Sequence, residues 1–327
     1  MSASDKRLNL AGVLNVIGPF LGLLLVLGLF ALSSEVRPHL FTGGNFKIIL
    51  TQTVIVAIGA LGMTMIIVSG GIDLSVGSTV ALTSVVGATL LLKGFSAPVT
   101  IALVVLAGGL IGLVNGLLIA GFRMMPFIVT LGMMGIIRGL AEWLAGNQTV
   151  NSPPDASLNK VMALTNPTEL FPLPPGVWIA LGLAIVVSFV MRRLVFGRYI
   201  FAIGANEMTA RFSGIRVPRQ KVMIYACAGL LFGLAGVMQL SRLTQGDPTV
   251  AAGLELDIIA AVVIGGASLN GGSGSILGSM IGALMMAVLR NSSNQMGWQN
   301  FTQKIIIGVV ILLAVGLDLL RQRRSRA

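Results

Sequence analysis

The chain has 327 residues, of which 55% are hydrophobic and only 10% are charged, and its mean hydropathy is +0.93. Soluble domains usually carry about a quarter charged residues, so this composition excludes an ordinary soluble protein and indicates an all-α integral membrane protein. The formal net charge is +11. Its positive residues gather near the termini and in one loop, which is typical of membrane topology and argues against nucleic-acid binding.

Apolar runs predict about ten transmembrane helices, because a bilayer core about 30 Å thick requires roughly 20 apolar residues for each crossing. In chain order the predicted helices cover residues 12–33, 48–69, 74–92, 97–121, 126–145, 176–192, 222–240, 256–269, 275–289 and 302–319. Lys and Arg gather before the first helix, between the sixth and seventh, and after the last. By the positive-inside rule, both termini are therefore expected in the cytoplasm.

Two sets of five helices would begin on opposite sides of the membrane, which is the condition for a 5+5 inverted repeat. A short echo in the sequence supports this division. The segment GIDL (71–74) opens the third predicted helix, and LELD (254–257) opens the eighth.

The segment SGGIDLSVGS (69–78) marks the hinge between the second and third helices, and Asp73 is the only charged residue between positions 48 and 92. One interpretation is that its carboxylate caps the third helix by accepting free backbone N–H groups of the first turn. The other is that Asp73, with Ser75 beside it, contacts a substrate or gates its path, because ionisable groups at membrane depth are usually functional.

Three further polar features carry similar pairs of interpretations. Asn115 in the fourth helix predicts an interhelical hydrogen bond or a polar group on the substrate path. Asp257, with Glu255, opens the eighth helix at the outward side and indicates either a solvated rim or a surface for a polyol or a docking protein. Arg138 and Glu142 lie four residues apart on one helix, a spacing that favours an ion pair.

Two connections are longer than a turn. The outward loop at residues 147–175 is rich in proline and predicts no fold of its own. The basic loop at residues 192–221 predicts one short helix, Asn206 to Phe212, starting at Gly204 or Asn206 and followed by Gly214. An apolar stripe on this helix needs a partner groove, the membrane surface or the chain's own helices to cover it; it consists of Ala205, Met208, Phe212 and Ile215.

Five motifs then occur in order: SGGIDLSVGS (69–78), NGLLI (115–119), PFIVTLG (126–132), GRYIFAIGANEMTARFSGI (197–215) and ELDIIAAVVIGGASLNGGSGS (255–275). Together they resemble the membrane permeases of ribose-type ABC importers, over about two thirds of the chain. The resemblance implies a single transmembrane permease domain, residues 1–327, in the bacterial inner membrane. It also implies pairing with a second permease copy, receipt of a monosaccharide from an extracytoplasmic binding protein, and a cytoplasmic ATPase that uses the ATP.

The resemblance further implies that the basic loop couples the permease to that ATPase. Met208 and Phe212 of the apolar stripe would then face it. Thr209 stands where an alanine is common in the family. The positions that match the family's coupling pattern are Gly197, Arg198, Ala202, Gly204, Asn206, Ala210, Ser213, Gly214 and Ile215.

Other function classes stay open at this point. A secondary sugar carrier or channel, a permease for branched-chain amino acids, and a scaffold are the alternatives. The amino-acid permeases usually lack GGIDLSVGS, so a pentose-like sugar is favoured. The sequence shows no nucleotide-binding motif or catalytic triad, and we expect neither enzymatic activity nor a bound cofactor. The identity of the sugar, and whether the second copy is identical or merely related, is left open.

Overall fold

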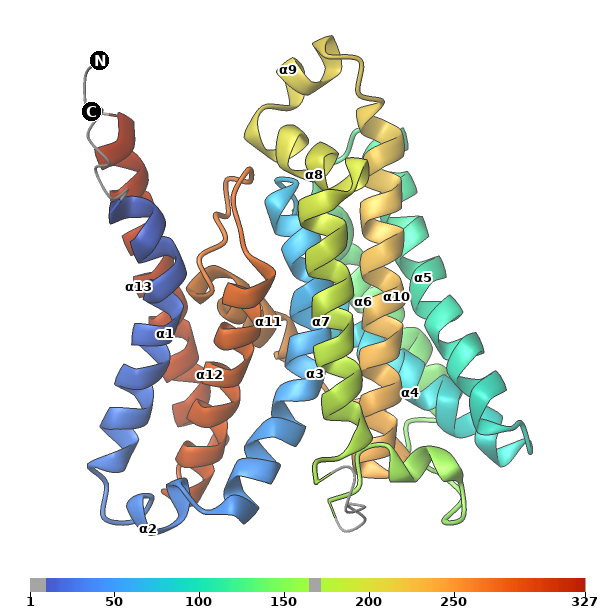
Figure 1. The fold of residues 1–327 in the computed structure, drawn as a ribbon. Coiled ribbons are helices and arrows are strands. Elements are labelled where there is room, and N and C mark those ends of the chain that lie inside the picture. The colour runs from blue at the N-terminus through green and yellow to red at the C-terminus, as the bar shows by residue number, and fades with distance from the viewer. Residues whose placement is uncertain (1–9, 165–171, 327) are drawn as a thin grey trace.

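The computed structural model describes residues 10–164 and 172–326 as a bundle of long helices with two short cross-helices at one end (Figure 1). The first half contains α1 (Leu10–Ala31), α2 (Arg37–Leu40), α3 (Gly43–Val68), α4 (Val76–Leu92), α5 (Ala97–Gly121), α6 (Pro126–Ala145), β1 (Val150–Asn151) and η1 (Ser157–Lys160). The second half contains α7 (Pro175–Arg193), α8 (Val195–Ala205), α9 (Glu207–Phe212), α10 (Val217–Leu243), β2 (Gln245–Gly246), α11 (Leu254–Ile264), α12 (Ile276–Gln295) and α13 (Asn300–Arg326).

Each apolar segment predicted to cross the membrane forms a helix, and α5 and α6 have the predicted bounds. Six of the described helices combine the length and the apolar composition of a membrane span: α3, α5, α6, α7, α10 and α12. The predicted end of the eighth helix at residue 269 is wrong. The helix α11 stops at Ile264, because Gly265 and Gly266 follow and Gly266 adopts a left-handed φ of +91°. Its 11 residues rise only about 16 Å, which is half of a bilayer core.

The structure corrects both loop predictions. In the outward loop, β1 pairs antiparallel with β2, η1 follows, and Leu158 is buried against the end of α10; the described part therefore has structure of its own, while residues 165–171 lie outside the described residues. In the basic loop, α9 confirms the predicted short helix. The preceding helix α8 was missed, because its 11 residues are too few to cross a bilayer core.

The helices α5 and α10 pack backbone to backbone. Gly108, Gly112 and Gly116 recur every fourth residue on α5; the first two face Gly229 or Gly233 on α10, and Gly116 faces Val222. A Cβ on Gly112 would overlap the carbonyl oxygen of Tyr225, which belongs to the backbone and cannot move aside. Small residues at this spacing allow the close helix contact that stabilises membrane bundles.

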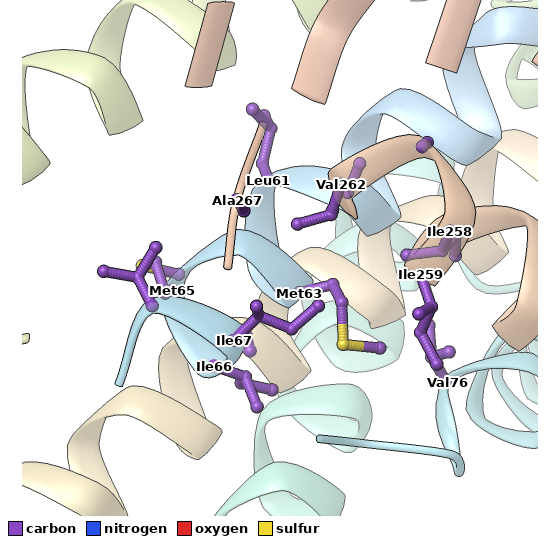
Figure 2. Close-up of a cluster of buried hydrophobic side chains, with 14 of the residues drawn as sticks. Leu61, Met63, Met65, Ile66, Ile67, Val76, Ile258, Ile259, Val262 and Ala267 are labelled. Atoms are coloured by element: carbon purple, nitrogen blue, oxygen red, sulfur yellow. The ribbon is translucent and has the colours of Figure 1, made fainter. Parts of the chain in front are cut away.

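The largest apolar cluster lies between α3, α10, α11 and α12. Figure 2 shows part of this cluster, which contains Leu61 and Ile67 of α3, Val76 of α4, and Ile258 and Val262 of α11. These side chains are fully buried. The cluster therefore fills the middle of the molecule with apolar atoms.

We expect Gly112→Ala to destabilise the protein by about 1–3 kcal/mol, because the added methyl group meets backbone on α10. The measurement is thermal unfolding of the purified protein in detergent. Gly132→Ala is the matched control, since a Cβ at Gly132 on α6 meets no atom within 4 Å. Equal melting temperatures for the two variants would contradict the close α5–α10 contact.

Candidate functional site

A polar cavity of about 270 Å³ lies among α3, α10, α11, α12 and α13. Figure 1 shows α8 and α9 at the end of the bundle opposite the start of α3. Five elements and the loop before α11 supply its lining, and most of the lining side chains are amides or charged. The polar lining residues are Gln52 of α3, Gln239 and Arg242 of α10, Asp257 of α11, Arg290 and Asn294 of α12, and Asn300 and Gln303 of α13. We call this space the polar cavity.

A second space of about 270 Å³ adjoins the polar cavity. Its walls include Asn159 and Met162 of the outward loop, and it shares Gln52 and Arg242 with the polar cavity. We call it the loop cavity. The side chains of Gln52 and Arg242 thus stand where the two spaces meet.

Asp257 pairs with Arg290, and only 3% of its surface is exposed. The interpretation of Asp257 as part of a solvated rim is therefore wrong. The pair is incomplete: Asp257 Oδ1 and Arg290 Nε are buried without a hydrogen-bond partner among the described atoms. No local pattern predicts a site at Gln52, Gln239, Arg242 or Arg290, because these residues come together only where helices distant in sequence meet.

The helix break after α3 is held by a different polar cluster. Asp73 Oδ1 accepts hydrogen bonds from the backbone N–H of Ser75 at 2.8 Å and from its hydroxyl at 2.6 Å. The amide of Asn115 on α5 donates to Asp73 Oδ2 at 3.2 Å and to Ser75 Oγ at 3.0 Å. All three side chains are at most 1% exposed. The cluster joins the segment before α4 to α5, and Asn115 makes the predicted interhelical hydrogen bond. Asp73 accepts only one backbone N–H, that of Ser75, the residue before α4, rather than several N–H groups of the first turn, and Asp257 is not part of this cluster.

Arg138 and Glu142 do not form the predicted ion pair. The guanidinium of Arg138 instead donates to the carbonyl oxygens of Pro248 and Val250, the latter at 2.8 Å. These carbonyls belong to the loop that leads into α11, whose Ala251 and Ala252 line the polar cavity. Arg138 thus fastens one wall of the cavity to α6. The i,i+4 spacing could not predict this, because the partner lies more than a hundred residues away in sequence.

The predicted coupling loop forms α8 and α9 at the other end of the bundle (Figure 1). The side chain of Asn206 caps α9 by accepting from Thr209 N–H at 2.9 Å, and Gly214 follows the helix with φ +85°. Both predicted helix signals are confirmed. Met208 and Phe212 are 67% and 85% exposed, whereas Ala210 packs against the loop's own residues. The stripe is therefore uncovered at Met208 and Phe212, whereas Ile215 packs against the loop's own residues.

The other coupling-loop positions shape the backbone or face solvent. Gly197 lies in the corner between α7 and α8, where a Cβ would overlap the carbonyl of Met191. Arg198 and Ser213 are exposed, and Ala202 packs beside Ile203.

Gly204 contacts two turns that contain glycine, the one after α3 and the one after α11. A Cβ on Gly204 would overlap the carbonyl oxygen of Val68, which ends α3. That carbonyl accepts a hydrogen bond from Gly272 N–H at 2.8 Å, in the turn between α11 and α12. We call the meeting of Val68, Gly204, Gly271 and Gly272 the glycine junction. Through this junction, α8 touches the end of α3 and the turn between α11 and α12.

An ion-pair network fastens α9 to α10. Glu207 accepts from Arg211 at 2.6 Å and from Lys221 at 2.7 Å. Partial burial raises the pKa of Glu207, but the hydrogen bonds and charges of Lys221 and Arg211 outweigh it and hold this pKa below its ordinary value. The carboxylate therefore stays ionised, and α9 keeps its orientation, at neutral pH.

Comparison with known proteins places the chain among transport permeases. The family described as "Branched-chain amino acid transport system / permease component" matches residues 45–315. The chain belongs to this permease family. It is 41% identical to the ribose import permease protein RbsC of Escherichia coli K12 over 298 residues, which is 90% of this chain and 92% of that protein. No solved structure matches.

Two further relatives extend the comparison. The ribose import permease protein RbsC of Bacillus subtilis is 40% identical over 97% of both chains. The L-arabinose ABC transporter permease protein AraH of Azospirillum brasilense is 36% identical over 91% of this chain and 87% of that protein. The resemblance to ribose-type ABC permeases is therefore confirmed.

We expect Asp73→Asn to lower stability by about 1–3 kcal/mol, because its new NH₂ group would face the NH₂ group of Asn115. The double variant Asp73→Asn/Asn115→Asp restores one donor facing one acceptor across α4 and α5. It should recover part of the loss in thermal unfolding, and no recovery would contradict the direct pairing. An unchanged transport rate in Asp73→Asn would remove the carboxylate from the substrate path.

Proposed function

We propose that this chain is the permease subunit of an ATP-driven ABC importer that moves a pentose-like monosaccharide across the bacterial inner membrane. Family membership and the ribose and arabinose permeases among its relatives support this proposal. The observation that carries it furthest is the polar cavity, since amide, guanidinium and carboxylate groups suit the hydroxyl groups of a sugar better than the side chain of an apolar amino acid.

The proposed topology has ten crossings arranged as a 5+5 inverted repeat, with both termini in the cytoplasm. Beside the six full-length spans, α1, α4, α11 and α13 supply the remaining segments. The first turn of α4 lies against the turn that opens α11: a Cβ on Gly77 would come within 2.6 Å of the carbonyl of Ala251. The start of α1 and the end of α13 lie at the end that carries α8 and α9 (Figure 1). Short helices that meet in this way are typical of inverted repeats, and termini at one end are expected for an even number of crossings.

The proposed partners occupy opposite ends of the bundle. At the cytoplasmic end, exposed Met208 and Phe212 on α9 offer apolar contacts for the ABC ATPase subunit. At the other end, the loop cavity and the outward loop would receive sugar from an extracytoplasmic binding protein. A second permease copy, identical or related, completes the membrane part. The chain itself needs no cofactor in this scheme, because the ATP is used by the ATPase.

The glycine junction supplies a mechanical route for coupling. Movement of α8 by the ATPase would reach the ends of α3 and of the α11–α12 turn directly, since Gly204 touches both. These turns flank the apolar cluster that separates the polar cavity from the cytoplasmic end. In this scheme Asp73, Ser75 and Asn115 keep the broken end of α4 in place beside the path, and Asp257 lies in the path at the polar cavity.

Reconstitution into liposomes tests the proposal. The permease with its ATPase and binding protein should take up labelled D-ribose or L-arabinose only when ATP is enclosed on the ATPase side. Uptake of labelled leucine under the same conditions would favour an amino-acid permease. Sugar movement by the permease alone, driven by an ion gradient, would show a secondary carrier and overturn the proposal.

We expect Gly204→Ala to reduce ATP-driven uptake at least about tenfold, because the added methyl group overlaps the Val68 carbonyl and forces α8 away from the junction. ATP hydrolysis and uptake should be measured together in the same liposomes. Hydrolysis that continues without uptake would locate the defect in coupling. Gly182→Ala on α7 is the matched control, since no atom lies within 4 Å of its added Cβ. Normal uptake in Gly204→Ala would remove the junction from coupling.

A further inference from the structure

The polar cavity contains hydrogen-bonding side chains that the protein itself leaves unused. Gln239 is only 7% exposed, yet its amide has no hydrogen-bond partner among the described residues. Gln52, half-buried beside it, has none either. Both amides line the polar cavity, so their hydrogen-bonding groups are available to a molecule that occupies it.

The charges of the cavity point in the same direction. Arg290 is paired with Asp257, but Arg242 has no carboxylate within ion-pair distance in the described structure. Two guanidinium groups and one carboxylate leave one positive charge uncompensated. Guanidinium N–H groups are strong donors that do not lose their charge, and the oxygen atoms of sugar hydroxyl groups are suitable acceptors for them.

The size of the cavity fits a monosaccharide. About 270 Å³ corresponds to roughly nine water molecules at about 30 Å³ each. A pentose has ten non-hydrogen atoms, half of them oxygen. A bound pentose would therefore displace most of the water and still meet polar groups on several sides.

We propose that the permease itself binds sugar hydroxyl groups in the polar cavity, with Gln239 and Arg242 as the direct contacts; this inference rests on the proposed function. Gln52 and Arg242 line the loop cavity as well, so a sugar arriving from that side meets them first. Asp257 positions Arg290 by holding its guanidinium against α11. Selection of the sugar then occurs twice, once on the binding protein and once inside the membrane.

The test compares D-ribose with its 2-deoxy, 3-deoxy and 5-deoxy analogues in liposomes that contain the complete importer. Each sugar is supplied on saturating amounts of loaded binding protein, so that differences between permease variants arise after delivery. We expect Gln239→Leu and Arg242→Met to slow maximal ribose uptake by about tenfold. Uptake of at least one deoxy analogue should fall much less, because that analogue already lacks the hydroxyl group in contact.

Matched controls replace the same residue types outside the cavities at the same end of the protein. Gln148→Leu and Arg37→Met change exposed side chains there and should behave as wild type. Gln52→Leu provides a further variant if Gln239→Leu fails to insert, and it should narrow the preference between ribose and a deoxy analogue in the same way.

The outcomes separate this inference from the proposed function. Variants that match their controls, or that slow every sugar by one common factor, would overturn a direct hydroxyl contact while leaving the importer assignment intact. Failure of the wild-type complex to move any sugar would overturn the proposed function and this inference with it. The expected result is that the ratio of ribose uptake to deoxy-analogue uptake falls in the cavity variants and not in their controls.

Discussion

Backbone contact at glycine residues is the constraint on which the rest of this structure depends. Association of helices in lipid gains little from hydrophobic burial, so close packing has to supply much of the stability. Gly112 on α5 permits that approach to α10, and the approach carries Asn115, three residues further, to the start of α4. The same constraint acts at Gly204, where α8 meets two turns. A methyl group at Gly112 would push α5 away from α10, and one at Gly204 would push α8 away from the two turns.

The two buried carboxylates show how hydrogen-bond satisfaction distinguishes a structural group from a binding group. Both oxygens of Asp73 have partners within its own cluster, which leaves the carboxylate closed to any ligand in this arrangement. Asp257 satisfies one oxygen through Arg290 and leaves the other without a partner. A buried polar group without a partner costs free energy, and this one belongs to a side chain in the wall of the polar cavity. The sequence marked both acids equally, because composition and position in an apolar run say nothing about partners.

Much of the fold could be predicted from the sequence, since hydropathy alone determines which segments enter a bilayer. The bounds of α5 and α6 and the cap of α9 at Asn206 follow from local signals that need no tertiary information. Local signals failed where partners are distant. Arg138 bonds to carbonyls beyond residue 247 rather than to Glu142, and the polar cavity draws Gln52 and Gln239 from helices nearly two hundred residues apart in sequence. A glutamine in an apolar helix has no pattern that separates a lipid-facing from a cavity-facing position.

The helix α3 connects these features along a single axis. Gln52 lies at the polar cavity, Leu61 to Ile67 belong to the apolar cluster, and Val68 ends the helix at the glycine junction. From Gln52 to Val68 the helix rises about 24 Å, most of the thickness of a bilayer core. Between the two lies the apolar cluster, and Thr64, the hydroxyl-bearing residue of α3 between Leu61 and Ile67, is already hydrogen-bonded to Ser279 of α12. In the proposed import mechanism this cluster would have to separate, and the glycine junction at its far end is where α8 contacts both α3 and the α11–α12 turn.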